Sequence, residues 1–203
     1  RVSNTVAAAI ESGVFAAVIV STDSDEYAAV ARYYGAEVPF PRPPELAGDK
    51  SSDIEWVAFT LSKLRDAGRT FDCFSILRPT SPFRKPETIR RAWDQFRADP
   101  NADSLRAVEK CGQHPGKMWV INGPRISPLL LQPAGVPFHS QQYAALPPVY
   151  VQNASLEIAW VRVALADPAS IAGEVLMPFL TQGDEGFDVY TAEDWFFAEH
   201  LLA

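Results

Sequence analysis

Two arginines and two hydroxyl residues stand close together in the sequence "ILRPTSPFR", residues 76–84. An apolar run ends at Arg78, Thr80 and Ser81 follow between two prolines, and Arg84 comes next. A plain loop would more often use Gly, Asn or Asp at these positions. Guanidinium groups beside hydroxyl groups suit an anion, so the stretch predicts a binding site for a phosphate or a carboxylate.

Two further polar loops are expected near this one, because each follows a predicted strand. The sequence "STDSD" at 21–25 follows an apolar run at 16–20, and a proline-rich loop at 41–50 follows a short strand at 36–40. Ligands of open α/β sheets bind where the carboxyl ends of the strands meet the loops. The pattern predicts one crevice surrounded by Arg42, Lys50, Arg78 and Arg84, with hydroxyl groups from Ser51, Ser52, Thr80 and Ser81.

The elements that must position these loops alternate between helix and strand over the first 110 residues. Ser52 and Glu55 form a capping box before one helix, and Pro86 lies near the first turn of the next. This alternation predicts an α/β fold with a mostly parallel central sheet and helices on both faces. The Trp and Phe residues of the helices expected at 86–97 and 192–202 are interpreted as core.

The pattern breaks between residues 114 and 151. This stretch is rich in Pro and Gln and contains one strand candidate, "KMWVI". A structureless insertion of this length is uncommon in a compact domain unless it binds something. We therefore expect one domain over residues 1–203 with an interaction element inserted at 114–151.

Composition excludes several classes of protein. The net charge of −7 and the pI near 5.0 argue against sequence-independent nucleic-acid binding, which needs a cationic face. No apolar run is long enough to cross a membrane. The two cysteines, Cys73 and Cys111, have no disulfide or metal-ligand spacing, which predicts free thiols and a cytoplasmic location.

Spacing alone leaves simpler explanations open for most of these residues. Helix capping explains Ser52 and Asp53, and a position next to a helix start explains Asp188. Arg78, Arg84 and Lys117 can be explained as solvent-exposed residues in or next to strands. His114, His139 and His200 share no spacing and are interpreted as structural or exposed.

A family resemblance covers nearly all of the chain. "VIVSTDSDEYAAVARYYGAEVPFPRPPELAGDKSS" followed by "LRPTSPFR" resembles the cytidylyltransferases that activate nine-carbon sugar acids, namely the CMP-sialic acid synthetases and their legionaminic and pseudaminic relatives. The likeness continues through "HPGKMW", "LPPVYVQNASL" and "GFDVYTAEDWFFAE". It implies a nucleotide-diphospho-sugar-transferase-like, Rossmann-like fold. It also implies transfer of CMP from CTP to a nonulosonic acid, release of pyrophosphate, Mg²⁺ as cofactor, and a homodimer formed through 114–151.

The resemblance also implies roles for individual residues. It assigns the nucleotide to Arg42, Ser52, Arg78 and Pro79, and the catalytic junction of nucleotide and acceptor to Arg78, Thr80 and Ser81. It assigns the sugar acid to Asn153 and to Lys117, which would enter the site of the partner subunit. It assigns the metal to Asp188.

Four residues depart from the family pattern, and among them Tyr143 and Glu157 favour a legionaminate-like or otherwise modified acceptor rather than sialic acid itself. Tyr190 stands where many members have a second metal-binding aspartate, and Tyr143 where sialate enzymes have an arginine. Glu157 stands where they often have a tyrosine, and Asp53 replaces a small hydroxyl residue.

The family's first strand and its glycine-rich triphosphate loop are expected before residue 1. Two alternatives follow from the same residues. One is a nucleotidyltransferase for another sugar or small acceptor, and the other is a non-catalytic dimeric relative without the triphosphate loop.

Overall fold

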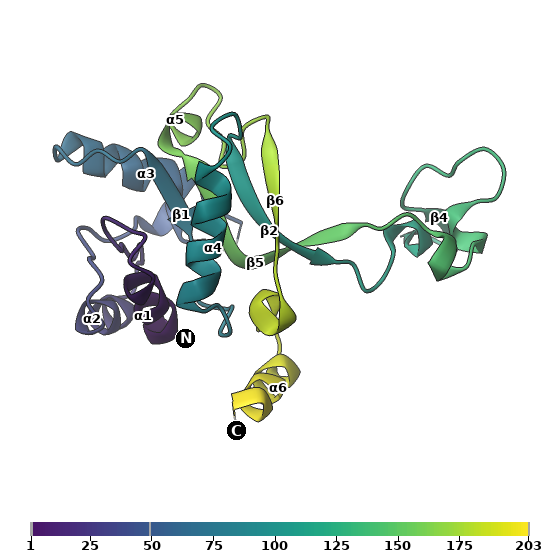
Figure 1. Ribbon diagram of the computed structural model, residues 1–203, viewed down its shortest axis with the longest axis horizontal. Coiled ribbons are helices and arrows are strands. Elements are labelled where there is room, and N and C mark those ends of the chain that lie inside the picture. The colour runs from purple at the N-terminus through teal and green to yellow at the C-terminus, as the bar shows by residue number, and fades with distance from the viewer. Residues whose placement is uncertain (1, 49, 203) are drawn as a thin grey trace. The chain divides into compact units, whose positions relative to one another are not determined.

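Two compact units make up the chain in the computed structural model, which describes residues 2–48 and 50–202. The sheet unit combines the parts of the chain before residue 109 and after residue 152, and the inserted unit spans Glu109–Gln152. The insertion expected at 114–151 falls within the inserted unit. The chain leaves the sheet unit along one strand and re-enters it along another (Figure 1).

The sheet unit contains six helices and four strands among its described residues. They are α1 (Val2–Ser12), α2 (Asp25–Tyr33), α3 (Asp53–Asp66), β1 (Cys73–Ile76), α4 (Pro86–Arg97), β2 (Ser104–Lys110), β5 (Tyr150–Trp160), α5 (Val161–Ala164), β6 (Leu176–Leu180) and α6 (Ala192–Leu202), where β2 and β5 extend into the inserted unit. Short 3₁₀ turns lie at Pro44–Leu46 and Gly183–Gly186.

The four strands form one sheet in the order β1-β5-β2-β6. β2 and β6 run parallel, as expected, whereas β1 and β5 run antiparallel, with Ile76 opposite Glu157. The sheet therefore mixes both pairings, because the strand that returns from the inserted unit enters it in the reverse direction. The α/β class expected from the alternating pattern is confirmed.

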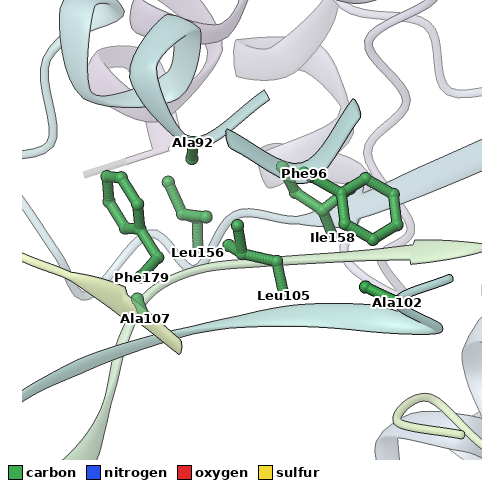
Figure 2. Close-up of a cluster of buried hydrophobic side chains, with 8 residues drawn as sticks. All are labelled: Ala92, Phe96, Ala102, Leu105, Ala107, Leu156, Ile158 and Phe179. Carbon is green, nitrogen blue, oxygen red and sulfur yellow. The ribbon is translucent and has the colours of Figure 1, made fainter. Parts of the chain in front are cut away.

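One face of the sheet packs against α4. Figure 2 shows Ala92 and Phe96 of this helix facing side chains that rise from β2, β5 and β6. Phe96 and Leu105 are completely buried. The stripe of apolar residues predicted in α4 is thus a core face, and its tight packing fixes the helix on the sheet.

The other face of the sheet packs against α3 and α5. Alternate residues of β1 divide between the faces, because Phe74 and Ile76 join the cluster around α3 whereas Cys73 and Leu77 join the α4 cluster. The prediction that helices cover both faces is therefore confirmed.

The predicted helix ends are largely confirmed. The Ser24 hydroxyl accepts a hydrogen bond from the backbone N–H of Tyr27 at the start of α2. That helix stops before Gly35, whose positive φ of 93° favours glycine. The Thr191 hydroxyl accepts from the backbone N–H of Asp194 at the start of α6.

The buried strand expected at 16–20 is reduced to a single parallel bridge between Ile19 and Glu37. Hydrogen bonds from Val20 N–H to Glu37 O and from Glu37 N–H to Val18 O hold it on one side. Residues 17–20 are only half-buried, and Ala16 is exposed. The reason is that the other side of this segment faces a cavity, described below, rather than a second strand.

The core interpretation of α6 is wrong. Phe196 is 75% exposed, Trp195 and Phe197 are also exposed, and Ala198 is the one buried side chain among those described in this helix. Phe197 packs against Phe187 with their ring centroids 5.3 Å apart. Apolar residues lie on several sides of α6, so the narrow contact through Phe197 and Ala198 leaves the rest exposed.

The inserted unit contains the hairpin β3 (Trp119–Asn122) and β4 (Arg125–Pro128), with 3₁₀ turns at Pro115–Lys117, Phe138–Ser140 and Tyr143–Ala145. β4 was not predicted. All four residues of β3 are exposed, although three of them are apolar. His114 is buried, and its Nδ1 accepts a hydrogen bond from the backbone N–H of Gly116, which agrees with its structural interpretation.

The structure also bears on membrane insertion and on the two cysteines. Among the residues that the structure describes, no helix is long and apolar enough to cross a bilayer. Cys73 and Cys111 are free thiols, and burial raises the pKa of Cys73 to about 12. Cys73 is therefore a packing residue rather than a nucleophile.

Candidate active site

A cavity of about 770 Å³ opens in the sheet unit beside β1. Its inner wall is apolar and includes Val18, Val20 and Ile76. Its polar end is formed by Ser21, Thr22, Arg42, Asp53, Trp56, Arg78, Pro79 and Thr80. The cavity thus brings together four residues that the resemblance assigns to the site, namely Arg42, Arg78, Pro79 and Thr80.

Arg42 is one of two arginines in this polar end. Its Nε and Nη2 donate to the Oγ and the backbone carbonyl of Ser21, at 3.1 and 2.6 Å. Its guanidinium lies over the Trp56 ring, 4.7 Å from the centroid. Burial lowers the pKa of Arg42, and the charges of Asp23 and Asp53 oppose this shift. None of the ion pairs within 4.0 Å among the described residues involves Arg42.

Arg78 is the other arginine of the polar end and is paired with two carboxylates. Its Nη1 and Nη2 contact Asp53 Oδ1 and Oδ2 at 3.3 and 2.6 Å, a bidentate arrangement. Nη2 also contacts Glu157 Oε1 at 3.0 Å. The hydrogen bond with Asp53 raises the pKa of Arg78 and lowers that of Asp53.

A second arginine continues this network across the sheet. Arg106 Nη1 lies 2.7 Å from Glu157 Oε2, and the two side chains are only 13% and 5% exposed. Asp53, Arg78, Glu157 and Arg106 therefore form a row of alternating charges that crosses from α3 over β1 and β5 to β2. We call these four residues the charged row.

The prediction that Arg84 borders the crevice is wrong. Arg84 is 4% exposed, and its guanidinium donates to the carbonyl oxygens of Ser155 and Arg78 and to the Thr5 hydroxyl. Burial lowers the pKa of Arg84 to about 10, while the negative charge of Asp188 opposes the shift. Arg84 anchors the loop at 78–84 to α1 and β5 from behind.

Asp188 lies next to this loop, because the backbone N–H of Val189 donates to the carbonyl of Thr80 at 2.9 Å. Both carboxylate oxygens are buried, and neither has a hydrogen bond of regular geometry. The Tyr190 hydroxyl donates toward this carboxylate, but not with regular hydrogen-bond geometry. This interaction raises the pKa of Tyr190. A buried carboxylate in this state suits a cation.

Ser81 and Ser52 lie at the margins of the site. Ser81 is buried next to Thr80, and among the residues that the structure describes its Oγ has no hydrogen-bond partner. Ser52 is exposed at the start of α3, where its backbone N–H donates to the Glu55 carboxylate at 2.8 Å. Neither residue lines the cavity, although Ser52 adjoins Asp53, which does.

The two residues assigned to the sugar acid lie in different units. Asn153 belongs to β5, where its Nδ2 donates to the Thr181 hydroxyl at 3.0 Å. Lys117 belongs to the inserted unit, where its Nζ donates to the carbonyls of His139 and Gln141 at 3.2 and 2.6 Å. It also lies over the Tyr143 ring, 5.3 Å from the centroid.

The sequence analysis included Ser21 in the polar loop at 21–25 without giving it a role of its own, and it missed Trp56 and Arg106. A signal for Arg106 was present, because "SLRAV" contains a single charge in an apolar strand, as does "SLEIAW" around Glu157. Two isolated opposite charges in buried strands indicate a paired interior site. Trp56 gave no such signal, since its spacing in α3 also fits the core.

Comparisons with known proteins decide the family. The family model described as "Cytidylyltransferase" matches residues 2–116. A CMP-N,N'-diacetyllegionaminic acid synthase of Legionella pneumophila is 33% identical over 204 residues, which covers 99% of this chain and 84% of that protein. This chain belongs to the cytidylyltransferase family. It is therefore a nucleotidyltransferase, and its cavity is the candidate active site.

Shorter matches and solved structures agree with this family. An N-acylneuraminate cytidylyltransferase of Escherichia coli is 46% identical over 88 residues, 43% of this cytidylyltransferase chain and 20% of that protein. The structure of a CMP:2-keto-3-deoxy-manno-octonic acid synthetase complexed with CTP covers 99% of the chain and 86% of its own length, with a TM-score of 0.68 at 15% identity. That likeness supports the nucleotidyltransferase fold.

Proposed function

We propose that this cytidylyltransferase transfers CMP from CTP to a nonulosonic acid. In this reaction a hydroxyl oxygen of the acid forms a bond to the α-phosphorus, the bond to pyrophosphate breaks, and the hydroxyl proton is released. The full-length similarity to a CMP-legionaminic acid synthase supports this substrate class. The observation that carries the proposal is the cavity that gathers Arg42, Arg78, Pro79 and Thr80.

The residues of the chain contribute mainly position and charge. Arg42 binds the phosphate groups of CTP, because it is the cation of the cavity that has no ion pair among the described residues. The Thr80 side chain at the cavity wall contributes a hydroxyl donor near the reacting groups. Ser81, which is buried, packs in the same loop as Thr80. Asn153, on β5, contacts the sugar acid.

Mg²⁺ fits the residues present. Among the described residues, no group of three or more His, Cys, Asp and Glu side chains could hold a metal ion. Mg²⁺ needs no such group, because it commonly binds one or two carboxylates together with water and substrate phosphates. Asp188 would hold the ion, which when bound neutralises phosphate charge.

We also propose that two copies pair through the inserted unit in the cytoplasm. Its exposed apolar side chains include Ile121, Ile126, Leu131 and Val136, and Leu131 is 96% exposed. An apolar patch of this kind is typical of an interface. Ile121→Asp is expected to convert a dimer to a monomer in light scattering. Lys63→Asp, which changes an exposed helix residue of the sheet unit, is the control and is expected to leave the dimer intact.

The experiment that tests the function measures pyrophosphate release from CTP and a panel of nonulosonic acids, using the full-length protein. We expect Arg42→Ala and Asp188→Ala each to abolish release, and the exposed Arg65→Ala to leave it unchanged. Normal release in the first two variants would remove the site assignment. Turnover with another nucleoside triphosphate or another sugar, in place of CTP and nonulosonic acids, would favour a different nucleotidyltransferase. Absence of turnover with every pair would favour a non-catalytic relative.

A further inference from the structure

The charged row is electrically balanced. It contains two cations, Arg78 and Arg106, and two anions, Asp53 and Glu157, linked by contacts of 2.6 to 3.3 Å. Arg106 and Glu157 are almost completely buried, so neither charge is screened by water. A ligand at this wall therefore meets no surplus of positive charge.

This balance makes the row a poor site for a triphosphate. The phosphates would approach the carboxylates of Asp53 and Glu157 as closely as the guanidinium of Arg78, and the like charges would repel. Among the described residues Arg42 has no ion pair within 4.0 Å, although the charges of Asp23 and Asp53 act on it from farther away. The triphosphate therefore belongs at the Arg42 side, although the loop at 78–84 first suggested the opposite.

Arg78 nevertheless retains donors for a ligand. A guanidinium carries five N–H groups, and the contacts with Asp53 and Glu157 engage three of them. The two that remain belong to Nε and Nη1. Two carboxylates hold the plane of this group, so the directions of its remaining donors are fixed, and Arg78 is among the residues that line the cavity.

We propose that Asp53 and Glu157 are positioning residues that hold Arg78 as a hydrogen-bond donor for an uncharged oxygen of the acceptor, a hydroxyl or an acylamino carbonyl. This inference rests on the proposed function and specifies the acceptor side of that same site. The balanced row selects a neutral polar group, since an anionic substituent there would face both carboxylates.

One contact connects this acceptor side to the nucleotide side. Trp56 Nε1 donates to Asp53 Oδ1 at 3.0 Å, while the ring of Trp56 lies under Arg42. Asp53 thus receives hydrogen bonds from Trp56 and from Arg78. This arrangement sets the distance between the two arginines, which is what a transfer between two bound substrates requires.

The test is Glu157→Gln, which keeps the shape of the side chain and removes its charge. Loss of one charge-assisted contact to Arg78 is expected to raise KM for the acceptor about tenfold, while KM for CTP stays within about twofold. The control is Asp103→Asn, which removes another carboxylate that pairs with an arginine, Arg162, and does not line the cavity. It is expected to leave both KM values unchanged.

Asp53→Asn provides a second variant if Glu157→Gln does not fold, because Asp53 is less buried than Glu157. It is expected to raise KM for the acceptor and to leave KM for CTP nearly unchanged. An equal rise in both KM values, or no rise in either, would overturn the inference alone. Absence of pyrophosphate release by the wild type with every nonulosonic acid would overturn the proposed function, and this inference with it.

Discussion

The two arginines at the polar end of the cavity differ in what surrounds them. Arg42 contacts a hydroxyl, a carbonyl and an indole ring, so its charge remains available to a ligand. Arg78 contacts two carboxylates, so its charge is compensated and its orientation is fixed. The same residue type therefore serves charge attraction at one side of the cavity and directed hydrogen bonding at the other.

Arg84 completes this comparison as an arginine without access to the cavity. We expect Arg84→Ala to lower the free energy of unfolding by about 3–5 kcal/mol, because it leaves Asp188 uncompensated and removes the guanidinium donor from the buried carbonyl of Ser155. Urea unfolding followed by circular dichroism measures this loss. A loss below about 1 kcal/mol would mean that the loop at 78–84 does not depend on this anchor.

Exchange of arginine for lysine separates the two kinds of role. Arg78→Lys keeps the charge but loses the bidentate contact, and we expect kcat/KM for the acceptor to fall about 100-fold. Arg42→Lys keeps the charge that the phosphates need, and we expect kcat/KM for CTP to fall only about tenfold. Steady-state kinetics with each substrate varied in turn measures both. Equal losses of kcat/KM in the two variants would contradict the proposal that Arg78 acts through its geometry and Arg42 through its charge.

Low pH tests the pairing of Arg78 with Asp53, because protonation removes the charge of the Asp53 carboxylate. Its pKa is lowered in the folded protein, chiefly by Arg78, so its contribution to stability is present above the unfolded value of about 3.9 and is lost as pH falls through the folded value. We expect the stability difference between wild type and Asp53→Asn to shrink below about pH 4. Thermal unfolding between pH 3 and pH 7 measures this, and a difference that is constant with pH would contradict the pairing.

Trp56→Phe is expected to have the smallest effect. Phenylalanine keeps a ring under Arg42 but loses the hydrogen bond to Asp53, which costs about 1 kcal/mol of stability. KM for each substrate is expected to change by less than about threefold. Trp56→Ala also removes the ring and should raise KM for CTP more. Identical kinetics in the two variants would show that the ring under Arg42 has no role.

Local signals in the sequence predicted much of the fold. The contact between Ser52 and Glu55 and the cap at Thr191 are formed by residues within four positions of each other, so their chemistry is visible in the sequence. The stripe in α4 was likewise readable, because helical periodicity determines which side chains share a face. The exposed apolar side chains of α6 were not, since a run that is apolar on several sides does not show which of them is covered.

Some of the residues that line the cavity were predictable from the sequence, but their pairing was not. The loops correctly placed Arg42, Arg78 and Thr80 at one cavity, because strand ends meet at one edge of a sheet. Arg78 and Glu157 are 79 residues apart, and their contact depends on β5 lying antiparallel beside β1. Arg84 illustrates the same limit, because its burial depends on partners in α1 and β5 that spacing within the loop does not reveal.

Direct binding of CTP without acceptor tests the central claim, which is that Arg42 holds the nucleotide and the charged row does not. Calorimetric titration of wild type, Arg42→Ala and Glu157→Gln compares the two sides of the cavity without turnover. We expect the Kd for CTP to rise about 100-fold in Arg42→Ala and to stay within about twofold in Glu157→Gln. A larger loss of CTP affinity in Glu157→Gln than in Arg42→Ala would contradict this division of the cavity.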